Sequence, residues 1–161
     1  MTATIRLWRI ATETRTYRAT DLTGAGAAQH PGRWNTTGEF VLYATQSLAL
    51  AVLETAAHID SIGLPLNKYV VQLAVPSAVW KRRAQLKLAT LDHAWSAIPA
   101  GKISVDAGSE WYQSGSSALL LVPSVVVPEE TVVLINATHR DADKLTATVA
   151  RRFDYNHLFR T

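Results

Sequence analysis

The stretch from Gly32 to Glu54 reads GRWNTTGEFVLYATQSLALAVLE and places a loop, an apolar strand and an apolar helix one after another. Residues 40–44 form a short aromatic and β-branched run, which predicts a strand. Thr45 or Ser47 can cap a helix over about residues 48–59, because hydroxyl oxygens accept hydrogen bonds from the first helical turn. That helix is apolar nearly all round, so we expect it in the core.

Glu54 is the most conspicuous residue of this helix. It stands among Leu, Ala and Val, and His58 follows four residues later on the same helical face. A carboxylate in such surroundings is expected to be partly desolvated, and desolvated titratable groups in clefts are candidates for chemistry. Glu54 is therefore the first candidate catalytic residue.

The segments on either side of this stretch predict a sheet. Strand-like runs occupy residues 5–10, 68–75, 116–128, 131–135 and 147–153, and a short helix over 106–114 should end at Gly115. We expect residues 80–103 to be irregular and the glycine-rich segment 23–38 to be a loop. Five or six strands with two or three short helices indicate one α+β domain over residues 1–161.

Composition excludes several classes of protein. The 161 residues contain no Cys, which excludes thiol catalysis, thiolate zinc sites and a disulfide framework and favours a reducing compartment, the cytoplasm by default. Neither a signal peptide nor a membrane span is expected, and the histidines lack metal-ligand spacing, so we predict no metal. The net charge of +3 fits a solvated surface or an anionic ligand, whereas the short basic clusters are unlike a nucleic-acid footprint.

Three further side chains are candidates for ligand binding. Arg9 lies within a predicted strand, where its charge needs a bound anion, an acidic partner or solvent. Arg33 lies in the glycine-rich loop as a fork for phosphate, and Trp34 beside it either stacks on a base or packs in the core. Burial alone explains Tyr43, unless its ring stacks on a planar ligand. Serine hydrolase chemistry is rejected, because no Gly-x-Ser-x-Gly motif is present.

These motifs together resemble the RES domain family, the toxins of bacterial Xre–RES toxin–antitoxin systems, which are named for an Arg, a Glu and a Ser. The resemblance covers almost the whole chain, and the motifs occur in the order of the family. They are Leu7-Trp-Arg-Ile, Gly32-Arg-Trp-Asn, Val41-Leu-Tyr-Ala, Leu48-Ala-Leu-Ala-Val-Leu-Glu, Ser117-Ala-Leu-Leu-Leu-Val-Pro-Ser and Leu134-Ile-Asn-Ala-Thr-His-Arg.

The resemblance implies a mixed, strongly twisted sheet similar to that of ADP-ribosyltransferase toxins. It also implies consumption of NAD+ by cleavage of the nicotinamide–ribose bond, through hydrolysis or phosphorolysis, with NAD+ as substrate and no cofactor. Arg33 and Glu54 match the naming Arg and Glu, whereas Ser117 and Ser124 both remain open for the naming Ser. Arg9 and Tyr43 match positions of the NAD+ pocket, and His157 in the C-terminal tail departs from the family pattern Phe-Asp-x-Arg-Leu-Phe.

The implied chemistry suits these residues. Cleavage develops positive charge on the ribose, which Glu54 would stabilise, while Arg9 and Arg33 hold the pyrophosphate and Tyr43 orients the leaving group. A serine hydroxyl, from Ser117 or Ser124, would fix the nicotinamide amide or the ribose. Whether water, phosphate or a macromolecule accepts the ADP-ribose stays open.

The resemblance also implies partners. An Xre-type antitoxin would cover the pocket, in a larger complex that can include a homodimer of this chain, and DNA would be contacted through the antitoxin. The first alternative is an ADP-ribosyltransferase that modifies a macromolecule. A distant alternative is a nucleic-acid-binding domain, suggested by the basic balance and five Trp residues.

Overall fold

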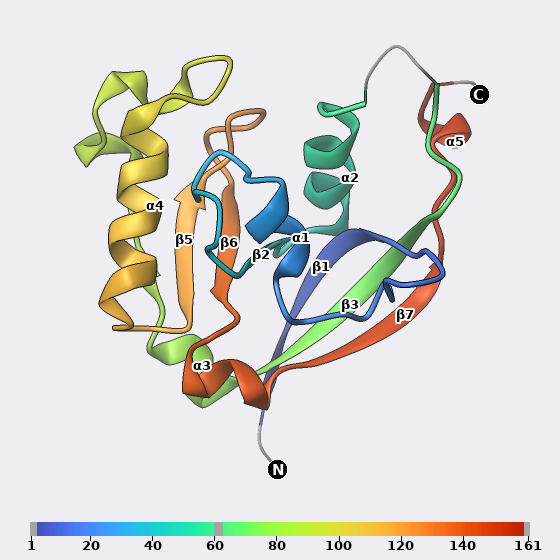
Figure 1. Ribbon diagram of the computed structural model, residues 1–161, viewed down its shortest axis with the longest axis horizontal. Coiled ribbons are helices and arrows are strands. Elements are labelled where there is room, and N and C mark those ends of the chain that lie inside the picture. The colour runs from blue at the N-terminus through green and yellow to red at the C-terminus, as the bar shows by residue number, and fades with distance from the viewer. Residues whose placement is uncertain (1–2, 60–62, 160–161) are drawn as a thin grey trace.

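Figure 1 shows the computed structural model, which describes residues 3–59 and 63–159. Its centre is a mixed seven-stranded sheet with the order β4-β5-β6-β2-β1-β3-β7, in which only β4 and β5 run parallel. Apolar and β-branched residues supply most of the strands, as expected for elements buried on at least one face. The strands are β1 (Thr4–Thr12), β2 (Val41–Thr45), β3 (Lys68–Pro76), β4 (Ala84–Gln85), β5 (Leu119–Pro123), β6 (Thr131–Asn136) and β7 (Thr146–Arg152).

The sheet divides between β1 and β2. These two strands are paired only at Trp8 and Thr45, whereas β1 pairs with β3 from Thr4 to Thr12. In Figure 1, β2, β6 and β5 stand together, while β1, β3 and β7 turn away from them. We call the opening beyond the Trp8–Thr45 pair the β1–β2 fork. Beyond this pair, the described residues of β1 and β2 form no further ladder with each other.

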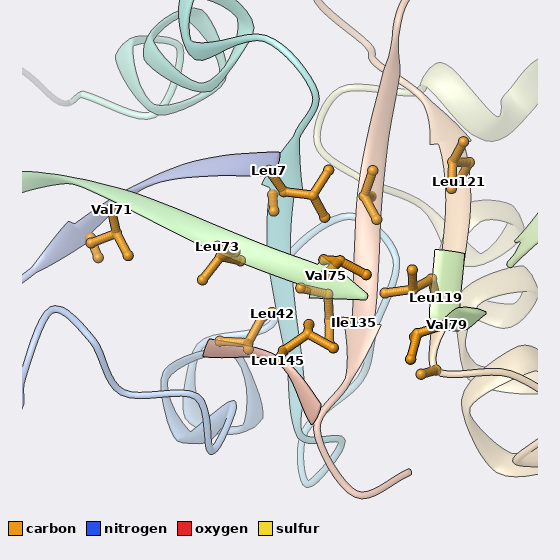
Figure 2. Packing of buried hydrophobic residues seen from close by; sticks show 14 of the residues in the cluster. Leu7, Leu42, Val71, Leu73, Val75, Val79, Leu119, Leu121, Ile135 and Leu145 are labelled. Carbon is orange, nitrogen blue, oxygen red and sulfur yellow. The ribbon is translucent and has the colours of Figure 1, made fainter. Parts of the chain in front are cut away.

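The two faces of the sheet carry separate clusters of buried apolar side chains. Because side chains alternate along a strand, Leu7 and Ala11 of β1 share one face with Val71 and Leu73 of the adjacent β3. Figure 2 shows this cluster continuing across β2, β5 and β6 to Ile135. On the other face, Ile10 and Val70 pack near the helix that follows β2. Separate apolar clusters on the two faces thus pack against the strands on either side of the fork.

The described residues also form five α-helices and three 3-10 helices. Ser47 caps α2 by accepting a hydrogen bond from the backbone N–H of Leu50, and Gly115 ends α4 in the left-handed conformation at φ 61°. The helices are α1 (Ala25–Gln29), α2 (Leu48–Ala56), α3 (Ser77–Lys81), α4 (Lys102–Ser114), α5 (Asn156–Phe159), η1 (Leu88–Thr90), η2 (His93–Ser96) and η3 (Arg140–Lys144).

The α+β class and the strand positions agree with the expectations from sequence, and four local expectations are corrected. Helix α4 begins at Lys102 rather than 106, and β5 covers 119–123 rather than 116–128, because the ladder to β6 ends at Pro123. The segment expected to be irregular contains β4, η1 and η2, and the glycine-rich loop contains α1. Within the described ranges, every helix is too short or too polar to cross a membrane.

Candidate active site

A pocket of about 650 Å³ lies at the β1–β2 fork. Its walls come from β1 (residues 8–12), β2 (residues 41–45) and the faces of α1 and α2 that point toward them. Figure 1 shows both helices beside the place where β1 and β2 separate. The polar side chains in the walls include Arg9, Tyr43, Glu54 and Lys68. The fork therefore brings together three of the residues singled out in the sequence and one that was not.

Glu54 is fixed by Ser124, which lies 70 residues further along the chain. The Ser124 hydroxyl, in the turn after β5, donates a hydrogen bond to Oε1 of Glu54 on α2. The same hydroxyl oxygen accepts from the backbone N–H groups of Val126 at 3.1 Å and Val127 at 3.0 Å. Ser124 is fully buried, whereas Glu54 reaches the pocket wall. Ser124 therefore orients the carboxylate from behind, which leaves Oε2 for a ligand.

Tyr43 presents its ring to the pocket while the protein occupies its hydroxyl. The hydroxyl donates to Oδ1 of Asn35 at 2.6 Å and accepts from the backbone N–H of Trp34 at 3.1 Å. Burial raises the pKa of Tyr43 well above its usual range, so the phenol is neutral. A Cβ at Gly32 would stand 2.8 Å from Cζ and Oη of the ring, so the glycine allows this close packing. The ring is thus held rigidly as a wall for a planar group.

Arg33 supports a loop and does not line the pocket. Its Nη1 donates to the backbone carbonyls of Trp95 at 3.0 Å and Ala97 at 2.7 Å. Burial lowers the pKa of Arg33, and the negative charge of Glu54 opposes this shift. Part of the guanidinium, Nη1, is committed to the loop around η2. These two bonds use only Nη1, and the expected role of Arg33 as a phosphate fork stays a prediction.

Trp34 packs in the core. It is buried and stacks on Trp95, with 5.9 Å between ring centroids. A Cβ at Gly108 would stand 1.7 Å from the Trp34 carbonyl oxygen, so α4 lies directly against this loop. Of the two roles considered for Trp34, packing is the one observed, and it fixes the backbone that carries Arg33.

Arg9 is the residue with the least satisfied charge in the pocket. Its Nε and Nη1 are buried and have no hydrogen-bond partner in the described part of the chain. Burial lowers the pKa of Arg9, while the nearby Tyr17 and Asp21 act in the opposite direction. Unsatisfied donors on a buried cation are costly unless an anion approaches them. Arg9 therefore has the properties of an anion-binding residue.

Ser117 lies away from the pocket. Its hydroxyl accepts a hydrogen bond from Nε1 of Trp111 and donates one to the carbonyl of Leu119, both at 2.9 Å. These contacts join the end of α4 to the start of β5. The two serines left open by the sequence thus lie at opposite ends of β5, and only Ser124 contacts Glu54.

Two polar residues of this region were missed in the sequence. Asn35 is 1% exposed and holds the hydroxyl of Tyr43. Lys68 begins β3 and donates to Oγ1 of Thr12 at 2.6 Å. The sequence motif Gly32-Arg-Trp-Asn contains Asn35, but the role of its amide as the acceptor for the Tyr43 hydroxyl depends on the position of β2 beside the loop. His157 lies in α5 and is exposed, outside the pocket wall.

Comparison with known proteins gives a consistent result. Residues 6–156 match the model of the RES domain. A protein of Sphingobium sp. (strain YBL2) named Prs ADP-ribosylating toxin is 50% identical over 153 residues, which cover 95% of each chain. Proteins named Toxin Res are similar too: that of Yersinia enterocolitica is 34% identical over 84% of this chain and 87% of its own. That of Photorhabdus laumondii is 32% identical over 80% of each chain. This chain belongs to the RES domain family.

Proposed function

We propose that this protein is a toxin that consumes NAD+ by breaking the bond between nicotinamide and ribose. The observation that carries the proposal is the Glu54 carboxylate, which Ser124 orients in the wall of the 650 Å³ pocket. The relatives named as toxins support the biological role. The name of the Sphingobium protein includes ADP-ribosylation, a reaction in which ADP-ribose is transferred from NAD+ to an acceptor and nicotinamide is released.

Glu54 supplies the electrostatic part of the reaction. As the bond from C1′ of the ribose to the ring nitrogen breaks, its electron pair leaves with nicotinamide and positive charge develops on the ribose. A fixed carboxylate stabilises that charge without reorganising during the reaction. An acceptor oxygen then bonds to C1′ and releases its proton. Ser124 is a positioning residue, because it contacts the carboxylate from the buried side.

Arg9 and Tyr43 bind the substrate in this proposal. The buried donors of Arg9 suit the oxygens of the pyrophosphate, and the ring of Tyr43 forms a flat wall for nicotinamide or adenine. Arg33 holds the loop around η2 through Nη1, and we propose that its remaining donors contribute to binding the pyrophosphate. No metal or resident cofactor takes part, and NAD+ is used up.

The proposal has two forms, which differ in the molecule that accepts the ADP-ribose. Hydrolysis or phosphorolysis would simply deplete NAD+. Transfer of ADP-ribose to a macromolecule is the second candidate, and the 50% identity with a protein named for ADP-ribosylating Prs favours considering it. Both forms use the same pocket and the same bond cleavage.

An active toxin of this kind requires control by a partner. We propose an Xre-type antitoxin that covers the pocket in the cytoplasm, in a complex that includes a homodimer of this chain. A carboxylate of the partner placed against Arg9 would mimic the phosphates of the substrate. Binding of DNA would then belong to the antitoxin.

The test is identification of every product formed from NAD+ by the purified protein. The reaction is run in the presence and absence of phosphate and of purified Prs, with Glu54→Gln and, as a matched control, Glu110→Gln. Glu110 is an exposed residue of α4 outside the pocket wall. Release of nicotinamide by the wild type and the control, but not by Glu54→Gln, is expected. Free ADP-ribose, phosphorylated ADP-ribose or labelled Prs identifies the acceptor, and unchanged NAD+ in every reaction contradicts the proposal.

A further inference from the structure

We propose that Arg9 and Lys68 together form a subsite for the pyrophosphate of the nucleotide, with Lys68 as the second phosphate-binding cation. This inference deepens the proposed function and rests on it for the identity of the substrate. It gives Lys68 the role that the sequence had suggested for Arg33.

The pairing of β1 with β3 places Lys68 at the pocket. Lys68 stands directly opposite Thr12 in the antiparallel register, and its Nζ donates to Oγ1 of Thr12 at 2.6 Å. Arg9, Thr12 and Lys68 all line the same pocket. An ammonium group has three donors, so the contact with Thr12 fixes Nζ and leaves two donors for a ligand.

Within the described residues, no carboxylate forms an ion pair with the cationic pair, Arg9 and Lys68. The ion pairs found in residues 3–59 and 63–159 join Arg82 and Lys144 to Asp141 and Lys102 to Asp106. Burial lowers the pKa of Lys68, and the positive charge of Arg9 lowers it further. Two cations that share a partly desolvated pocket repel each other, and a bound anion would relieve this repulsion.

The arrangement of charge in the pocket matches a dinucleotide with a cationic end. Glu54 lies on α2, whereas Arg9 and Lys68 lie on the paired strands β1 and β3, so the carboxylate and the cationic pair come from different walls of the pocket. In NAD+, the nicotinamide ring is positive and the pyrophosphate is negative. Glu54 therefore suits the first group, and the cationic pair suits two adjacent phosphates. Arg33 already donates to two carbonyl groups and is less available.

Calorimetric titration with adenosine diphosphate tests the subsite without any need for catalysis. We compare the wild type with Lys68→Met, which keeps an unbranched apolar side chain but lacks the ammonium group, and with Lys68→Arg, which keeps the charge. The matched control is Lys87→Met, because Lys87 is exposed and lies outside the pocket wall. Thermal unfolding of each variant checks the fold. Inorganic phosphate and adenosine are titrated in parallel to distinguish the group that is recognised.

We expect Lys68→Met to weaken binding of adenosine diphosphate by about tenfold or more and to reduce its salt dependence. Lys68→Arg should bind within about threefold of the wild type, and Lys87→Met should not differ. Adenosine binding should not respond to any of these changes. Equal affinity of wild type and Lys68→Met for adenosine diphosphate would overturn the inference. So would an effect confined to inorganic phosphate, which would assign the cations to a free phosphate instead.

The same variants separate this inference from the proposed function. In NAD+ turnover, Lys68→Met should raise KM with little change in kcat, as expected for a residue that binds substrate and transition state equally. If the wild type does not consume NAD+ but adenosine diphosphate binding still depends on Lys68, the subsite stands and the proposed reaction fails. If NAD+ is consumed and the KM of Lys68→Met is unchanged, the reaction stands and the subsite fails.

Discussion

A buried serine lies at each end of strand β5, and the two serines differ in their hydrogen-bond partners. Ser117 precedes the strand and Ser124 follows it, and both are almost completely buried, at 4% and 0% exposure. Ser117 bonds to an indole N–H and a backbone carbonyl, so its partners are structural. Ser124 bonds to a carboxylate in the wall of a pocket. Residue type and burial are the same, and only the partner distinguishes a candidate functional serine from a structural one.

The comparison of Ser117 with Ser124 depends most strongly on the role of Glu54, the partner of Ser124. If the Ser124 end of β5 is the reactive end, Glu54→Gln should lower NAD+ turnover by about a hundredfold, or roughly 3 kcal/mol, because it removes the charge that faces the developing cation. The amide keeps the size of the side chain, so the thermal unfolding midpoint should change little. Nicotinamide release, normalised to folded protein, measures the effect. Wild-type turnover in the folded variant would remove the distinction between the two ends.

Ser124→Ala should have the next largest effect. The change frees the Glu54 carboxylate from its orienting donor and removes the acceptor for the N–H groups of Val126 and Val127. We expect kcat to fall about tenfold with KM nearly constant, because orientation matters most in the transition state. A loss of stability of about 1 kcal/mol should accompany it. A change in stability alone, with normal kcat, would make Ser124 as structural as Ser117.

Ser117→Ala is the matching variant to Ser124→Ala, at the other end of β5. It leaves the Trp111 indole N–H without its buried acceptor, so the free energy of unfolding should fall by about 1–2 kcal/mol. Urea unfolding measures this loss. Turnover per folded molecule should equal that of the wild type. A tenfold loss of kcat in the stable fraction would show that the serine distant from Glu54 also takes part in catalysis.

The sequence predicted much of the fold because local patterns determine it. The strand over 68–75, the cap at Ser47 and the helix end at Gly115 all follow from neighbouring residues, and the structure has each of them. The β1–β2 fork was not predictable in this way. It arises because β1 pairs fully with β3 but only once with β2, at Trp8 and Thr45, and such pairing is a property of distant segments.

The candidate site shows the same limit. Glu54 stands out locally, since a carboxylate on an apolar helix is unusual, and it does line the pocket. Arg33 is a predicted phosphate fork, and nothing in the sequence indicates that the carbonyls of Trp95 and Ala97, more than 60 residues away, accept hydrogen bonds from its Nη1. Lys68 had no local signal, because only the register of β1 against β3 brings it to Thr12. The sequence therefore identified charged residues better than it identified their partners.

The smallest expected effect is a pH dependence of kcat/KM that comes from Lys68. It tests whether substrate binding at the cationic pair is separable from the chemical step at Glu54. Lys68 has a lowered pKa because of burial and the charge of Arg9, so it begins to lose its proton at a lower pH than an ordinary lysine. The neutral amine binds phosphate weakly. Arg9 itself stays charged, and Thr12, which contacts Nζ, does not titrate.

The value of kcat/KM for NAD+ should therefore fall as pH rises from neutral toward the ordinary titration range of lysine, and the fall should begin below that range, while kcat stays level. Because kcat/KM reports on the free enzyme, the fall follows the proton of Lys68 before substrate binds. Lys68→Arg should abolish the pH dependence, since a guanidinium stays charged throughout this range. If kcat falls in parallel in both proteins, the titrating group acts on the chemical step, and the separation between the cationic pair and the Glu54–Ser124 end fails.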